Sequence, residues 1–410
     1  MRSFLFIVYV FLFSSLYSQT NDYNELLDSA KNMYKKQNGL IQDELDQFDY
    51  NNLIELLEHI VDIQPNNIEA RYFLGYTYSK LNSRDGRGMM HTNKDLVEKS
   101  STQFEEIIKL APKYSGEIIV LDPYSKISSE WGSLAMSYWY RNQKDSAYWA
   151  FNQGKKRGGF SDFVLELNKK FLDACSPNAI LISSGDNFTF ALWYLQILNN
   201  YRKDVSVIDV SLLNTTWFPT YLSKNNLVGF DIPNSILDTI EYITWSDSIV
   251  SINNFSWTVK PSLYDTYLIR GDRLLLSMLK QNQFQRDFYF TIAFAEESRL
   301  SLKNFINKKI IIDQLTTQKV KELSYTQYKS TMESVLSLSK FINVNSTDEI
   351  WLYDIFRYEL FGKIYDYISK NDKQKAKELL LILDTYGHEN KIPYKNEEGK
   401  KYAETLREIL

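Results

Sequence analysis

Two short apolar runs joined by an amphipathic segment constrain the fold of this chain more than any other feature. The first run, residues 179–182, is followed by the polar residues 183–187, and large apolar side chains then recur at helical spacing over residues 188–201. A second apolar run, residues 205–210, follows a short polar turn. This order predicts a βαβ unit with two buried, parallel strands. We therefore expect an α/β module in which a ligand binds at the carboxyl ends of the strands.

Polar residues follow both predicted strands. Asp or Asn at a helix N-terminus caps free N–H groups, and the same position binds an anion or a sugar hydroxyl if the side chain turns outward. Asp209 interrupts an apolar strand, so we expect it near the strand end, facing a partner or a cleft. The Asn and Trp after this strand suit carbohydrate or peptide contact, and a Trp covering the sheet edge is the structural alternative. The candidate ligand-binding residues are Gly185, Asp186, Asn187, Asp209, Asn214 and Trp217.

The start of the chain has the organisation of a secretory signal. Arg2 supplies a positive charge, residues 4–13 are apolar, and small serines precede Gln19. We predict a signal peptide over residues 1–19, with a retained N-terminal anchor as the alternative. Polar residues interrupt every later apolar run, so no further membrane-spanning segment is expected. With Cys175 as its one cysteine, the chain has no intramolecular disulfide, and export without disulfides favours a bacterial periplasm or cell envelope.

Residues 20–160 have the pattern of degenerate tetratricopeptide-like repeats, which are pairs of helices with small and bulky apolar residues at fixed offsets. Leu74 and Gly75 mark one unit, and Trp131 marks another. A glycine-rich, charged stretch at residues 83–91 interrupts one unit and predicts a surface loop. This loop is either a tolerated insertion or a contact with a partner or an anion.

Helical periodicity returns over residues 326–410, where apolar side chains form inward-facing stripes. The predicted fold class is therefore α/β. A Rossmann-like parallel-sheet module occupies residues 161–325, between the N-terminal repeats and the C-terminal helices.

Several motifs in the α/β region resemble a bacterial envelope family. Its members are multi-spanning membrane proteins first catalogued as a domain of unknown function and linked to lipid-dependent protein O-mannosyl transfer, with a soluble periplasmic C-terminal portion. The motifs are GKKRGGFSD at 154–162, NAILISSGDNFTFALWYLQ at 178–196, RKDVSVIDVSLLNTTWF at 202–218, and QRDFYFT at 285–291 followed by LSL at 300–302.

The resemblance covers roughly residues 147–325 and implies the soluble module of that family. Two positions depart from the family pattern, since Phe188 replaces an acidic residue and Ala191 replaces a proline. The membrane-embedded half, where transfer from a lipid carrier would occur, is not part of the resemblance. The transferase activity is therefore not implied for this chain.

Other function classes lack their signatures in this sequence. There is no glycine-rich dinucleotide fingerprint, phosphate-binding loop, HExxH motif or Gly-x-Ser-x-Gly elbow. The three histidines have no second ligand at helical spacing, so we expect no metal and no cofactor. A net charge of −4 without a basic stripe argues against nucleic acid as a partner.

These observations favour an exported, non-catalytic envelope protein. Its helical repeats would form a scaffold, and its α/β module would bind a glycan, a peptide or an envelope protein. The alternative is a glycosyltransferase-related or hydrolytic enzyme that uses Asp186 and Asp209 as acid and base. It requires both carboxylates to face one cleft, with at least one strongly shifted pKa. A third possibility is a purely structural module, with binding on the concave face of the repeats.

Overall fold

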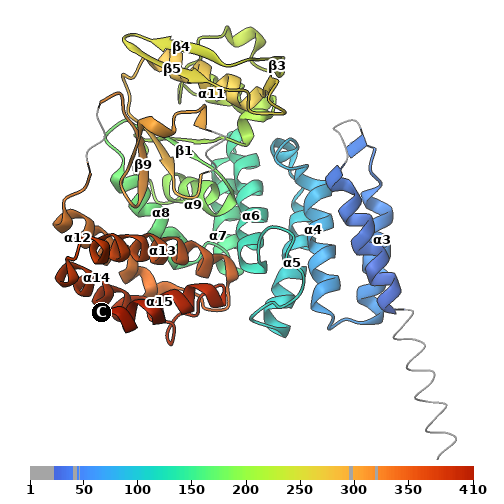
Figure 1. Cartoon of the computed structure of the whole chain (residues 1–410). Coiled ribbons are helices and arrows are strands. Elements are labelled where there is room, and N and C mark those ends of the chain that lie inside the picture. Colours follow the sequence, from blue (N-terminus) through green and yellow to red (C-terminus); the bar gives the residue numbers. More distant parts are fainter. Residues whose placement is uncertain (1–22, 40–43, 46, 295–298, 319–321) are drawn as a thin grey trace, which may run out of the picture.

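The structure is a computed structural model that describes residues 23–39, 44–45, 47–294, 299–318 and 322–410. Helices come first along the chain, a mixed α/β portion follows, and helices return at the end (Figure 1). The coarse prediction of an α/β fold with a helical N-terminal region is confirmed. The predicted signal peptide at residues 1–19 lies outside the described residues.

The N-terminal helices lie side by side and form an array (Figure 1). Asn67, Asn93 and Asp122 each accept a hydrogen bond from a main-chain N–H in the first turn that follows, which fixes where three of these helices begin. A Cβ on Gly75 would lie 2.8 Å from the Phe104 ring, so a glycine allows two neighbouring helices to approach closely. After a helical stretch at residues 23–36, the array contains α3 (Tyr50–Ile63), α4 (Ile68–Ser83), α5 (Lys94–Leu110), α6 (Pro123–Tyr140) and α7 (Lys144–Lys156).

A five-stranded sheet with the order β2-β1-β7-β9-β8 forms the centre of the α/β portion. The central strand β1 (Ile180–Ser183) is buried along its whole length and pairs in parallel with β2 (Ser206–Asp209) and β7 (Phe288–Thr291). The predicted parallel pair is therefore present. Apolar, β-branched side chains explain β1, because both faces of a parallel sheet are covered.

The sheet is mixed, whereas the sequence predicts a parallel-sheet module. Strands β8 (Ile306–Lys308) and β9 (Ile312–Leu315) add to the sheet in antiparallel orientation. Only residues 309–311 join these two strands. A connection this short cannot make the crossover that parallel strands need, so β8 and β9 form a hairpin.

The helix between β1 and β2 starts and ends earlier than predicted. Helix α9 spans Asp186–Ile197, whereas the periodicity predicts residues 188–201. Gly185, with φ 93° and ψ 154°, ends the strand and lets the helix begin at the next residue. Asn200 and Arg202 both have positive φ, which turns the chain before β2.

The other helices of the α/β portion lead into and out of this unit, and two small antiparallel pairs lie above it (Figure 1). In the part of the chain that the structure describes, no helix has both the length and the apolar character needed to cross a bilayer. The remaining elements here are α8 (Asp162–Ala174), α10 (Trp217–Lys224), β3 (Ile243–Thr244), β4 (Ser248–Ile252), β5 (Phe255–Val259), β6 (Tyr267–Leu268) and α11 (Arg270–Asn282).

The C-terminal helices pack below the sheet, beside α8 (Figure 1). Their longest member is capped by Ser346, whose side chain accepts from the N–H of Glu349 and donates to the carboxylate of Asp122 at 2.5 Å. Because Asp122 caps α6, this contact links the C-terminal helices to the array. These helices are α12 (Tyr325–Leu336), α13 (Thr347–Ser369), α14 (Lys373–Tyr386) and α15 (Glu397–Ile409).

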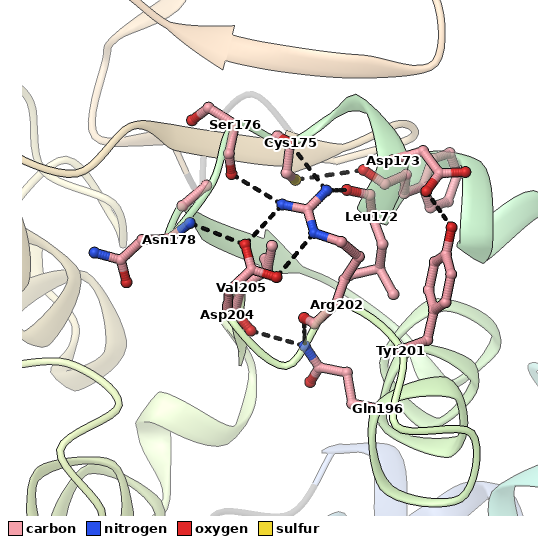
Figure 2. A network of polar contacts seen from close by, with 12 residues as sticks. Leu172, Asp173, Cys175, Ser176, Asn178, Gln196, Tyr201, Arg202, Asp204 and Val205 are labelled. Atoms are coloured by element: carbon pink, nitrogen blue, oxygen red, sulfur yellow. Dashed lines mark hydrogen bonds and ion pairs between the residues drawn. The ribbon is translucent and has the colours of Figure 1, made fainter.

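Arg202 fixes the turn before β2 against the end of α8 (Figure 2). Its guanidinium donates to three main-chain carbonyls, those of Leu172 at 2.6 Å, Cys175 at 3.2 Å and Ser176 at 3.1 Å. The carboxylate of Asp204 pairs with the same guanidinium at 2.8 Å. The carbonyls of Leu172 and Ser176 also accept from main-chain N–H groups, so Arg202 adds a charged donor to a turn that is already hydrogen-bonded.

Candidate functional site

A cavity of about 370 Å³ with a mixed polar and apolar wall lies at the carboxyl ends of β1 and β2, where the sheet meets the helical array. Gly185, Asp186 and Asp209 form the wall on the side of the sheet. Helices α4 and α6 and the loop that follows α4 form the opposite wall. Small-molecule sites commonly enclose about 300–1,000 Å³, so this cavity has the size of a binding site.

Asp209 is the last residue of β2 and is only 5% exposed. Its Oδ1 accepts from the N–H of Leu212 at 2.9 Å, and its Oδ2 accepts from the hydroxyl of Thr189. Burial raises the pKa of Asp209 to about 6, and the negative charge of Asp186 adds to this rise. Both oxygens of the Asp209 carboxylate are therefore hydrogen-bonded. These bonds offset the free-energy cost of burying a charged group.

Asp186 links α9 to the helical array. Its Oδ2 accepts from the hydroxyl of Ser129 on α6 at 2.5 Å. The N-cap residue of α9 is Gly185, and no side chain caps this helix. The capping role considered for Asp186 and Asn187 is therefore not observed, although a carboxylate in the first turn still interacts favourably with the helix dipole.

Helix α6 supplies polar groups that the sequence alone did not identify as part of a site. Lys126 lies 2.7 Å from the carboxylate of Glu130 and donates to the hydroxyl of Ser79 at 2.8 Å. Its ammonium also lies 4.6 Å from the centre of the Tyr76 ring. Both charged side chains are buried, so the pair is satisfied internally rather than by water.

The sequence feature that could have identified these α6 residues is a stripe of polar side chains along the helix. Lys126, Ser129, Glu130 and Ser133 recur at helical spacing, and all of them are buried. A polar stripe normally indicates the solvent-facing side of a helix. Here α6 packs against both α5 and α9, so its polar face borders the cavity instead of solvent.

The first described helix and the loop after α4 complete the wall. Tyr34 is fully buried and lines the cavity from the first described helix. In the loop, Asp85 pairs with Lys80 at 2.6 Å. The predicted surface loop at 83–91 therefore borders the cavity.

Three of the six predicted site residues lie outside the cavity wall. Asn187 is buried, and its main-chain carbonyl accepts from Asn168 at 3.0 Å. Asn214 accepts from the N–H of Gly271 at 2.8 Å, at the start of α11. The indole N–H of Trp217 donates to the carbonyl of Gly86 at 2.9 Å. The chain turns away after β2 in a short 3₁₀ helix, η3 (Leu212–Asn214), and this carries Asn214 and Trp217 away from Asp209.

No group of three or more His, Cys, Asp or Glu residues in the described ranges is placed to hold a metal ion.

Residues 164–255 match the family described as TMEM260-associated domain 2. The matched segment runs from within α8 to the start of β5 and contains Gly185, Asp186 and Asp209. It lies inside the stretch that resembles a family linked to O-mannosyl transfer and supports that resemblance in outline. No curated protein matches the chain.

Proposed function

We propose that this chain is an exported, non-catalytic binding protein of a bacterial envelope. Tetratricopeptide-like helix pairs form its scaffold, and a Rossmann-like module carries the binding site. The cavity at the strand ends holds a group of a glycan, peptide or protein partner. A sugar is the group that the chemistry of the wall fits best.

The observation that carries this proposal is the convergence of two carboxylates and several hydroxyls on one cavity. Asp186 and Asp209 line one side of the cavity, and Ser129 and Ser133 of α6 line the other. Carboxylate and hydroxyl oxygens accept hydrogen bonds from sugar hydroxyls, and hydroxyl groups can also donate. The aromatic ring of Tyr76 adds an apolar surface to the same wall, and ligand sites combine such surfaces with a few polar groups.

An acid/base enzyme is the second candidate, because two observations favour it. Asp186 and Asp209 line the same cavity, and the pKa of Asp209 is raised to about 6. A catalytic acid or base must, however, reach a substrate atom at hydrogen-bond distance. Both oxygens of Asp209 already accept from groups of the protein, which favours binding over catalysis.

A glycan array probed with the purified protein tests the proposal. Ligands found there are then titrated calorimetrically against the wild type and Asp186→Asn. We expect Asp186→Asn to weaken binding about tenfold, because a hydrogen bond to a charged acceptor is lost. The control is Asp145→Asn, which removes an exposed carboxylate from the first turn of α7 and should leave affinity unchanged.

Two results would decide against the proposal. Absence of binding to any glycan would contradict the sugar site. Turnover of a glycoside by the wild type, abolished in Asp209→Asn, would establish the enzyme instead.

A further inference from the structure

Exposed tyrosines mark the β3–β6 pair, which lies at the end of the molecule opposite the C-terminal helices (Figure 1). Tyr264 is 83% exposed and Tyr242 is 62% exposed, so both are among the most exposed large apolar side chains that the structure describes. Leu263, which precedes Tyr264, is exposed as well. These three side chains are called the tyrosine surface below. Aromatic side chains left open to solvent in one place are typical of interaction sites.

Tyr267 of β6 connects the parts of the tyrosine surface. Its ring meets the ring of Tyr242 edge-on, with 5.3 Å between the ring centres. Its N–H donates to the carbonyl of Leu263 at 3.0 Å, and the N–H of Leu263 donates back to its carbonyl at 3.1 Å. Tyr264 and Asp265 both have positive φ, so the chain reverses tightly at this point. The two exposed tyrosines are therefore carried by one small hydrogen-bonded unit.

The stretch that carries the tyrosine surface is the acidic part of the chain. Residues 231–268 contain five carboxylates and one lysine, and these account for the whole net charge of −4. Glu241 directly precedes Tyr242, and Asp265 directly follows Tyr264. All five carboxylates are exposed: Asp231, Asp238, Glu241, Asp247 and Asp265.

Two arginines at the start of α11 contact this stretch without pairing with its carboxylates. Arg270 donates to the main-chain carbonyls of Leu237 at 2.6 Å and of Ile240, and Arg273 donates to that of Glu241. The charges of two of the carboxylates act on Arg270 only at longer range. Among the described residues, no Lys, Arg or His forms an ion pair with any of the five carboxylates. Negative charge beside the tyrosine surface is therefore available to a partner.

We infer that the tyrosine surface docks a cationic, arginine-containing segment of a protein partner. The guanidinium groups pair with the carboxylates beside the two tyrosines and lie over the tyrosine rings, since arginine makes both contacts. Charge complementarity selects this partner, because the same carboxylates repel nucleic acids and anionic bilayers. None of the three side chains lines the cavity at the strand ends. The inference therefore goes beyond the proposed sugar site and does not depend on it.

Fluorescence anisotropy with a short labelled peptide, in which arginine alternates with serine, tests the charge. The full chain is compared with a triple variant, Asp238→Asn with Glu241→Gln and Asp265→Asn. We expect the wild type to bind the peptide and the triple variant to bind it about tenfold more weakly, because three exposed ion pairs are lost. Failure of the wild type to bind the peptide would overturn the inference.

The control is a second triple variant, Glu55→Gln with Asp62→Asn and Asp145→Asn. It removes the same charge from exposed positions on the helical array. Its affinity for the peptide should equal that of the wild type. Equal losses in the two triple variants would overturn the inference, because binding would then follow net charge rather than this surface.

Substitution of the tyrosines tests the aromatic contribution. Tyr242→Ser with Tyr264→Ser should weaken binding of the arginine peptide about fivefold, because the cation–π contacts are lost. Tyr402→Ser, which removes an exposed tyrosine from α15, should have no effect. If thermal unfolding shows that the double variant is not folded, the single variant Tyr264→Ser replaces it. Unchanged affinity in the folded tyrosine variant would overturn the docking surface.

Sedimentation with vesicles distinguishes a protein partner from a membrane. Vesicles of equal amounts of phosphatidylglycerol and phosphatidylethanolamine should not bind the wild type, because both surfaces carry negative charge. Binding to these vesicles that is lost in Tyr264→Ser would overturn the inference and assign the tyrosine surface to a bilayer instead.

Discussion

The N–H of Asp122 donates to the carboxylate of Asp348 at 3.0 Å, and the N–H of Asp348 donates to the carboxylate of Asp122 at 3.1 Å. The two residues are 226 positions apart in the chain. They lie at the starts of α6 and α13, so each helix start provides an acceptor for the other. This reciprocal contact joins the helical array to the C-terminal helices.

The contact between the starts of α6 and α13, here called the joint, predicts that the protein becomes more stable on mild acidification. Burial, followed by the charge of Asp122, raises the pKa of Asp348 to about 6, and burial raises the pKa of Glu349 to about 7. Between pH 4 and 7 the folded state therefore binds more protons than the unfolded state. Its free energy of unfolding should fall by roughly 5 kcal/mol as the pH rises through this window. Urea denaturation at a series of pH values measures this change.

The double variant Asp348→Asn with Glu349→Gln isolates the contribution of the joint. Its stability should depend less on pH than that of the wild type over the same window. At neutral pH it should be at least as stable, because two desolvated charges are gone. Parallel pH profiles for the two proteins would show that other groups cause the dependence.

Gly185 and Gly362 predict opposite effects of the same substitution. A Cβ at either position would meet no atom within 4 Å, so only the backbone decides the outcome. Gly185→Ala forces alanine into a conformation near φ 93° and ψ 154° that favours glycine, and should cost about 1–3 kcal/mol. Gly362→Ala, inside α13, should stabilise the protein by about 0.5–1 kcal/mol. Thermal unfolding of both variants checks the signs, and destabilisation by Gly362→Ala would contradict the prediction.

Arg202→Ala should destabilise the protein by roughly 3 kcal/mol, because three carbonyl groups and Asp204 lose a charged donor. Lys203→Ala is the control, since Lys203 is exposed and its ammonium donates to the side chain of Asn200. Guanidinium denaturation of both variants measures the difference. Similar losses in the two variants would mean that water replaces the contacts of Arg202.

Cys175 should be unreactive in the folded protein. The side chain is buried, and burial raises the pKa of its thiol to about 12. Because the thiolate is the reactive form, iodoacetamide should label Cys175 only when the region opens. The labelling rate should rise in Arg202→Ala, because the guanidinium holds the carbonyl of Cys175. Fast labelling of the native wild type would contradict this prediction.

The sequence predicted the elements whose pattern is local. The apolar runs of β1 and β2 and the helix between them follow from composition and period, and their parallel pairing follows from the connection. The hairpin of β8 and β9 was missed because Asn307, Lys308 and Asp313 break any apolar alternation. Such edge strands are stabilised by the sheet they join rather than by their own residues.

Three of the six residues proposed from the sequence line the cavity. Gly185 and Asp209 follow from the rule that strand ends form sites in such folds. Tyr34 and Lys126 could not be placed, because they reach the cavity through packing between segments far apart in the sequence. A single sequence contains no record of those contacts.

Helix α6 lies outside the segment shared with the TMEM260-associated family, and so does β7, the second neighbour of β1. In a fragment of residues 164–255, one side of the central strand β1 would have no hydrogen-bond partners. Asp186 would also lack the hydroxyl of Ser129. Recurrence of this segment in another protein therefore does not bring the cavity with it. Each host must supply its own second wall, and two hosts with the same segment can select different ligands.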